Sequence, residues 1–161
     1  MDDNPYAPPK AKVGEMVSQG LPEAPSEARL YSQDQIALAT FLGTPLVGGW
    51  LIAANDKTLA RLEQANKAIA VGIGVTLVVL ALAVVLPDSF PNIALPVVCA
   101  VAFRAWADSR FSTVLERHKA NGGARYSWWR VVGLALLSTA IVFTLMFIVF
   151  MLLYTFGIEL N

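Results

Sequence analysis

Reactive and charged side chains are scarce in this chain of 161 residues. It contains one cysteine and one histidine, and its net charge at pH 7 is zero. The single cysteine, Cys99, excludes an internal disulfide, and its apolar neighbours indicate a small buried side chain. The single histidine, His118, lies in a basic segment, where one imidazole makes neither a metal site nor an effective general base. Without a net basic charge, nucleic acid is not an expected partner, and we expect no cofactor.

The sequence also has little charge, and one long stretch has none. Charged residues make up 15% of the chain and apolar residues 56%, against about 25% and about 45–50% in typical soluble domains. No charged residue lies between Arg130 and Glu159. About 18 apolar residues suffice for a span, and residues 131–158 would form a helix about 42 Å long, longer than a hydrocarbon core of about 30 Å. These features predict a multi-span membrane protein. No basic region followed by an apolar run opens the chain, so we expect no cleaved signal peptide.

The hydrophobic segments predict an all-α integral membrane protein, an antiparallel four-helix bundle in which successive helices are neighbours. Residues 1–30 form a polar, proline-rich tail that cannot bury enough apolar surface to fold, so we expect it to be disordered or extended. Residues 31–161 form the predicted transmembrane domain, with spans at about 35–55, 68–86, 92–107 and 131–157.

The third span is the weakest of the four. Arg104 costs about 3 kcal/mol at a helix centre, which nearly cancels the gain of about 3 kcal/mol from the apolar residues before it. It lies toward the far end of the span, from which it can extend to the headgroups. A re-entrant segment is the alternative for this stretch. After it, apolar residues recur at helical spacing among basic ones, which predicts an amphipathic helix over about 108–120 at the cytoplasmic surface.

Three local patterns predict where helices begin, bend and end. Ser32 and Gln35 have the spacing of a capping box, which starts a helix. Pro45 removes a backbone hydrogen bond and is expected to kink the first span. The stretch Asn121–Gly123 tolerates positive φ and is expected to end the amphipathic helix.

Glycines in the first two spans lack a side chain that would hold a neighbouring helix away, so we expect them at close helix contacts. A broken helix that lines a substrate or ion site is the functional alternative. No ionisable residue accompanies the kink, which favours packing. The candidate packing and kink residues are Gly43, Pro45, Gly48, Gly49, Gly72 and Gly74.

Basic and aromatic side chains gather between the third and the last span. Trp and Tyr are enriched at membrane interfaces, and each Lys or Arg near an anionic surface adds about 1 kcal/mol of attraction. We therefore expect this segment to contact lipid headgroups. The candidate contacts are Arg104, Arg110, Arg117, Lys119, Arg125, Trp128, Trp129 and Arg130.

The positive-inside rule sets the predicted orientation. The loops after the first and third spans, together with Arg104, hold nine of the basic residues, whereas the tail holds three and the remaining loop and the C-terminus hold none. Both basic loops are therefore expected in the cytoplasm and both termini in the periplasm.

Four stretches together carry a resemblance to a known kind of protein. They are NPYAPP at residues 4–9, YSQDQIALATFLGTPL at 31–46, LPDSFPN at 86–92 and GGARYSWW at 122–129. In this combination the chain resembles uncharacterised small four-span inner-membrane proteins of Gram-negative bacteria. The resemblance covers most of the chain and implies the bacterial inner membrane as its location. It implies no activity, cofactor or catalytic residue.

The expected function is non-enzymatic. Hydrolysis within a membrane needs paired carboxylates, an activated nucleophile or metal ligands, and the predicted spans contain no interior acid. A scaffold, subunit or regulator would act through helix–helix and lipid contacts, with the bilayer, other membrane proteins or further copies of this chain as partners. The alternative is a small oligomeric transporter or channel, for which the hydroxyl side chains in the spans are the supporting feature.

Overall fold

Five α-helices and no strand make up the part of the chain that the computed structural model describes, residues 27–87, 89–91 and 93–155. The all-α prediction is confirmed for these residues. Residues 1–26 of the predicted tail (1–30) and the last residues of the fourth predicted span lie outside them. The end of the predicted tail is folded, because Leu30 is buried in the core. The helices are α2 (Gln33–Leu42), α3 (Pro45–Thr58), α4 (Leu62–Val85), α5 (Ala94–Ala120) and α6 (Trp128–Thr155).

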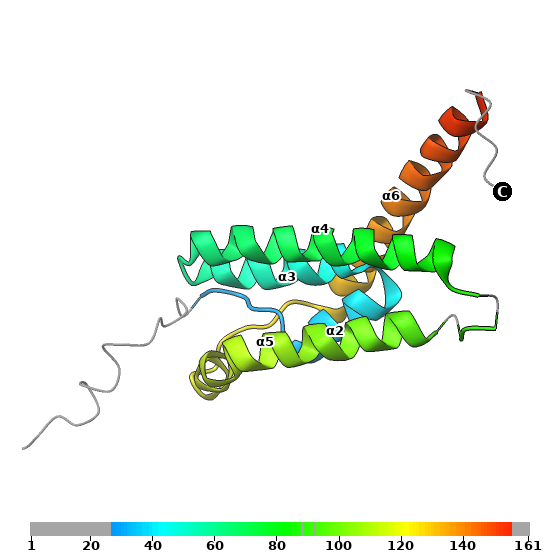
Figure 1. Cartoon of the computed structure of the whole chain (residues 1–161). Coiled ribbons are helices and arrows are strands. Elements are labelled where there is room, and N and C mark those ends of the chain that lie inside the picture. Colours follow the sequence, from blue (N-terminus) through cyan, green and yellow to red (C-terminus); the bar gives the residue numbers. More distant parts are fainter. Residues whose placement is uncertain (1–26, 88, 92, 156–161) are drawn as a thin grey trace, which may run out of the picture.

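The predicted first span, residues 35–55, is two helices instead of one. α2 ends at Leu42 and α3 begins at Pro45, where a proline fits because the first helical residue has no partner for an N–H. The chain reverses between them, since the amide N of Tyr31, before α2, lies 2.9 Å from Oδ1 of Asn55, near the end of α3. The ends of one continuous helix over this range would lie about 30 Å apart. α2 and α3 therefore form a helical hairpin, which replaces the predicted kinked span (Figure 1).

The hairpin lies between α4 and α5, so the arrangement differs from a bundle in which successive long helices are neighbours (Figure 1). α3 packs along α4, while α2 packs on α5 and α6. α4 and α5 run in opposite directions, and α6 leaves the bundle obliquely. Only the N-terminal half of α6 is packed, because its buried residues are Val131, Ala135 and Ser138.

The helix boundaries follow the capping signals in the sequence. The side chain of Ser32 accepts a hydrogen bond from the backbone of Gln35, and the side chain of Gln35 accepts one from the backbone of Ser32, so the predicted capping box is confirmed. α5 continues without a break through the third predicted span and the predicted amphipathic helix. It ends as expected, because Gly122 has a φ of 74° and the amide of Gly123 donates to the carbonyl of His118 at 2.7 Å.

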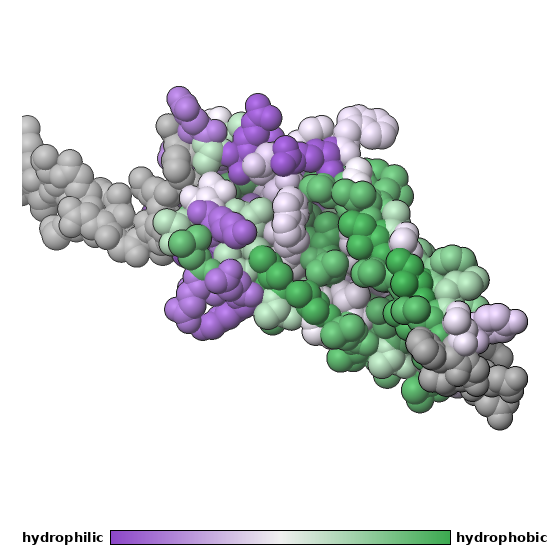
Figure 2. Space-filling model, turned by 90° about the horizontal axis from the view of Figure 1, so that it is seen from above, coloured by the Kyte–Doolittle hydropathy of each residue, from purple (hydrophilic) through white to green (hydrophobic). Residues whose placement is uncertain are grey.

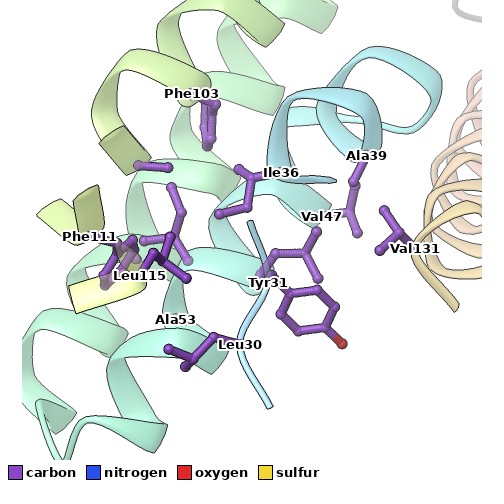
Figure 3. Close-up of a cluster of buried hydrophobic side chains, with 14 of the residues drawn as sticks. Leu30, Tyr31, Ile36, Ala39, Val47, Ala53, Phe103, Phe111, Leu115 and Val131 are labelled. Atoms are coloured by element: carbon purple, nitrogen blue, oxygen red, sulfur yellow. The ribbon is translucent and has the colours of Figure 1, made fainter. Parts of the chain in front are cut away.

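The hydrophobic core lies around the base of the hairpin, which we define as the place where α2 begins and α3 ends (Figure 3). Side chains from the segment before α2 and from all five helices meet there. The large, fully buried ones include Leu30, Tyr31, Ile36, Leu51, Phe111 and Val131.

Much of α4 and most of α6 expose apolar side chains. Among the described residues, two segments, Leu62–Ala83 and Trp128–Thr155, are long and apolar enough to cross a membrane, and α5, which contains the third predicted span, is not one of them. In the most apolar 18 consecutive residues of these two segments, only 22% and 6% are buried. On the face seen in Figure 2, hydrophilic residues gather toward one end and hydrophobic residues toward the other. We call the first end the polar end; it comprises the start of α2, the turn between α3 and α4, the end of α5 and the segment that leads into α6.

Candidate functional site: the helical hairpin

The base of the hairpin is closed by the side chain of Asn55. Its Oδ1 accepts a hydrogen bond from the amide of Tyr31 at 2.9 Å, and its Nδ2 donates to the carbonyl of Tyr31 at 2.8 Å. Both residues are buried. The carboxamide therefore satisfies both backbone groups of a residue that lies outside the helices, as a neighbouring strand would do. This clamp ties the chain that enters α2 to the last turn of α3.

We expect Asn55→Ala to lower the free energy of unfolding by about 2 kcal/mol, because it leaves two buried backbone groups of Tyr31 without partners. Asn66→Ala removes the same side chain from an exposed position of α4 and is the matched control. Unfolding of both variants in detergent, followed by circular dichroism, measures the difference. Equal midpoints for the two variants would show that the clamp contributes nothing.

Next to the clamp, Asp56 of α3 is paired with Arg110 of α5. Oδ2 of the carboxylate lies 2.8 Å from Nη2 of the guanidinium; the Asp56 side chain is fully buried and that of Arg110 is 19% exposed. The same Nη2 donates to Oε1 of Gln64 in α4 at 2.7 Å. The guanidinium carbon also lies 5.5 Å from the centre of the Trp106 ring, within cation–π distance. One guanidinium thus joins α3, α4 and α5.

The electrostatics of the Asp56–Arg110 pair indicate that it positions α3 against α5 and adds little to the free energy of folding. Burial raises the pKa of the Asp56 carboxyl, and the charge of Arg110 acts in the opposite direction. Among the residues that the structure describes, neither Oδ1 of Asp56 nor Nε of Arg110 has a hydrogen-bond partner. A buried pair with such incomplete hydrogen bonding gains little net free energy, because desolvation offsets most of the Coulomb attraction.

The segment that leads into α6 is held on the same base. The rings of Tyr31 and Tyr126 stack with their centroids 4.1 Å apart. The guanidinium of Arg130 lies 4.7 Å from the Tyr126 ring, and its Nε donates to Oη of Tyr31 at 3.1 Å. Nε2 of Gln35 donates to the carbonyl of Tyr126 at 2.7 Å. Burial raises the pKa of the Tyr31 phenol, so this group is a neutral acceptor at pH 7.

At the other end of the hairpin, which we call the tip (Leu42–Pro45), hydroxyl groups of α6 contact one side chain and one backbone carbonyl. Oγ1 of Thr44 and Oγ of Ser138 lie 2.7 Å apart, and Oγ1 of Thr139 donates to the carbonyl of Leu42 at 3.2 Å. The last carbonyls of a helix have no intrahelical partner. α6 therefore supplies hydrogen bonds at the place where the predicted first span is interrupted.

The predicted packing glycines fall into two groups. A Cβ at Gly48 would collide with Oγ1 of Thr40, and a Cβ at Gly49 would lie 2.8 Å from Cα of Gly72, so α3 is in close contact with α2 on one side and with α4 on the other. Gly74 has no such neighbour within 4 Å. The residues at close contacts are Gly43, Gly48, Gly49 and Gly72.

The residues predicted to contact headgroups differ in whether they bind other side chains of this chain. Arg110 and Arg130 are engaged with side chains of this chain, as described above. Nε of Arg104 lies 2.9 Å from Oδ1 of Asp34 in the first turn of α2, while more than half of its side chain stays exposed. The remaining five lie exposed or half-buried at the polar end: Arg117, Lys119, Arg125, Trp128 and Trp129.

Two hollows border the tip. A groove of about 530 Å³ runs between α4 and α6 and also touches Leu46 of α3. Its one polar lining residue is Thr76, whose hydroxyl donates to the carbonyl of Gly72 at 2.8 Å. A smaller cavity of about 90 Å³ lies beside the tip and is lined by Thr40, Thr44 and Thr76 together with apolar residues.

The buried polar side chains of the base and the tip bond to backbone or to one another, and no group of three potential metal ligands occurs within the described ranges. Sequence reasoning missed Tyr31, Asn55 and Asp56. The available signal was their position, since Asn55 is the last residue of the predicted first span, Asp56 follows it directly and Tyr31 lies four residues before its start.

Comparison of the chain with protein-family models, curated proteins and solved structures found no match.

Proposed function

We propose that this chain is a non-enzymatic integral membrane protein, a scaffold, subunit or regulator that acts through helix and lipid contacts. One observation carries the proposal. α6 is a 28-residue apolar helix, and only 6% of its most apolar 18 consecutive residues are buried within the chain. A soluble protein would bury such a helix in its core, whereas lipid or another membrane helix would cover it here.

In the proposed arrangement α4, α5 and α6 cross the bilayer, and the hairpin enters and leaves it from the polar end. α4 and α6 would be about 36 and 42 Å long, enough for a hydrocarbon core of about 30 Å. α5 would be about 40 Å long, but its uncharged part, Ala94–Phe103, would cover only about 15 Å, so its crossing relies on Arg104 extending to the headgroups. α2 would be about 15 Å long and would reach only half the depth of the core. Irregular backbone at membrane depth needs partners within the protein, and Thr139 supplies one at the tip by donating to the carbonyl of Leu42.

The hairpin also changes the proposed orientation of the N-terminus. The chain would enter α2 from the same side as both basic loops. Residues 68–103 and 131–161 contain no Lys or Arg, so all twelve basic residues would lie on the side of the polar end. The positive-inside rule then supports a cytoplasmic polar end and N-terminus and a periplasmic C-terminus. The location that we propose, the bacterial inner membrane, rests on the family resemblance.

Reporter fusions at each terminus test this arrangement. We expect a green fluorescent protein fusion to fluoresce at the N-terminus and an alkaline phosphatase fusion to be active only at the C-terminus, because the three crossing helices put the termini on opposite sides. Termini on one side would contradict the hairpin and favour four full spans. Release of the protein from membranes by alkaline carbonate without detergent would contradict membrane integration itself.

The exposed residues of the polar end support a lipid-contact role. Lys119 and Arg125 are exposed there beside Trp128 and Trp129. Indole rings favour the headgroup level, and each basic side chain adds about 1 kcal/mol of attraction to an anionic leaflet. The polar end would therefore lie at the level of the cytoplasmic headgroups and contact them.

A small oligomeric transporter or channel is the second candidate. The observation that favours it is the break at the tip beside a cavity of about 90 Å³ with hydroxyl residues in its lining, since transporters place substrate sites at broken helices. No charged side chain lines this cavity. Ion or solute flux in proteoliposomes that Thr44→Val abolishes would support this candidate, and an absence of flux would contradict it.

A further inference from the structure

We propose that the groove between α4 and α6 holds one acyl chain of a phospholipid from the leaflet opposite the polar end. This inference rests on the proposed membrane arrangement and names the ligand of one surface within it. The groove has a volume of about 530 Å³, which is within the range of small-ligand sites.

The lining of the groove is almost wholly apolar. Along α6 the lining residues recur at helical spacing from Val142 to Leu153 and consist of Val, Leu, Met and Phe. The facing wall on α4 includes Ile73, Leu77 and Leu80. The hydroxyl of Thr76 already donates a hydrogen bond within α4, so the lining offers no unsatisfied donor to a polar ligand. Such a surface gains free energy only from hydrocarbon.

The groove has the length of one leaflet. Its wall on α6, from Val142 to Leu153, extends for about 17 Å along the helix, and half of the hydrocarbon core is about 15 Å thick. It begins beside Leu46, directly after the tip. The hairpin therefore fills the space between the long helices on the side of the polar end, and the groove is the space that it leaves open on the other side.

The side chains of the groove favour a flexible chain over a second helix. Membrane helices associate closely where small residues let their backbones approach. No glycine, alanine or serine occurs among the residues that line this groove. An acyl chain can follow such an irregular wall, whereas a helix backbone would be held away from it.

The headgroup of this lipid would lie near the end of α6, away from the basic residues. Because residues 68–103 and 131–161 contain no Lys or Arg, the site has no cation with which to select an anionic headgroup. Retention of lipid in the groove should therefore not depend on headgroup charge, in contrast to lipid bound at the polar end.

Two methionines of α6 provide a matched test. Met146 lines the groove and Met151 does not, and their side chains are 49% and 44% exposed. We expect the full-length protein, purified in detergent with equal amounts of phosphatidylethanolamine and phosphatidylglycerol, to retain about one phospholipid per chain in native mass spectrometry. Met146→Trp should reduce retention at least fivefold by filling the groove, and Met151→Trp should leave it unchanged. Val149→Trp, on the groove wall, is a second filling variant in case the first does not fold.

Several outcomes would overturn the groove assignment while leaving the membrane proposal intact. The first is equal lipid retention by the groove variants and by Met151→Trp, and the second is retention of phosphatidylglycerol alone. The third is a protein that still requires detergent but retains no lipid. The fourth is a disulfide-linked dimer of Met146→Cys, which would show a second copy in the groove. Extraction by carbonate without detergent would instead remove the membrane arrangement on which the inference rests.

Discussion

Asp56→Ala is expected to lower the free energy of unfolding by about 4 kcal/mol, since removing one partner of a buried ion pair leaves the other charge uncompensated. The remaining guanidinium of Arg110 is 19% exposed and would keep Gln64 as its one hydrogen-bonded side chain. Denaturant unfolding in mixed micelles measures the loss. The control is Glu63→Ala, because Glu63 forms a pair of similar length with Lys67, 2.6 Å, in which both side chains are largely exposed. Such a pair is screened by solvent, and no measurable change is expected.

The double variant Asp56→Leu/Arg110→Met tests separately whether the ion pair sets the position of the hairpin and whether it contributes to the free energy of unfolding. Replacing both charges by apolar side chains removes their desolvation together with their attraction, so it should recover most of the stability that the single variant loses. If the hairpin depends on this pair for its position, the double variant should fold but lose the cytoplasmic N-terminus in the reporter assay. A double variant that is as unstable as Asp56→Ala would contradict the uncompensated-charge explanation.

Gly49→Ala is expected to cost about 3 kcal/mol, at the upper end of the range for overpacking. The added Cβ would lie 2.6 Å from the carbonyl O of Ala68 and 2.8 Å from Cα of Gly72. Both are backbone atoms of α4, which cannot rotate away as a side chain could, so α3 and α4 must separate.

Gly74→Ala is the control for this prediction. The position is in the same helix as Gly72 but has open space around it. Alanine is the better helix former by about 1 kcal/mol, so this variant should unfold at the wild-type midpoint or above it. Thermal unfolding of both variants in one detergent gives the comparison. A Gly49→Ala protein as stable as wild type would show that α3 and α4 do not approach closely.

The helix ends and the exposed helices could be predicted because their signals are local. The Ser32–Gln35 capping box and the Gly122 turn act within a few residues, and each forms as expected. The apolar character of α4 and α6 is a property of composition alone. The close contacts of Gly49 and Gly72 were indicated by residue type, but the same residue type at Gly74 marks no contact, because which face of α4 meets α3 is not encoded in the glycine itself.

The reversal at the tip could not be predicted from the same local information. Pro45 is compatible with a kink inside one helix and with the start of a new one. The choice between them depends on groups far away in the chain: Asn55 binds Tyr31 24 residues before it, and Ser138 lies 94 residues after Thr44. The use of Arg110 as a partner of buried Asp56, and not as a free surface cation, depends on a contact of the same kind.

The sequence by itself determined that the chain is helical, that its last helix is long and apolar enough to cross a membrane, and that its basic residues are segregated from two long stretches without Lys or Arg. These are sums over neighbouring residues, which need no knowledge of the fold. Only the tertiary structure decided that the first apolar segment turns back on itself and where a groove is left open. Those features depend on hydrogen bonds and backbone contacts between distant residues, and many pairings of such residues are equally compatible with the same local pattern.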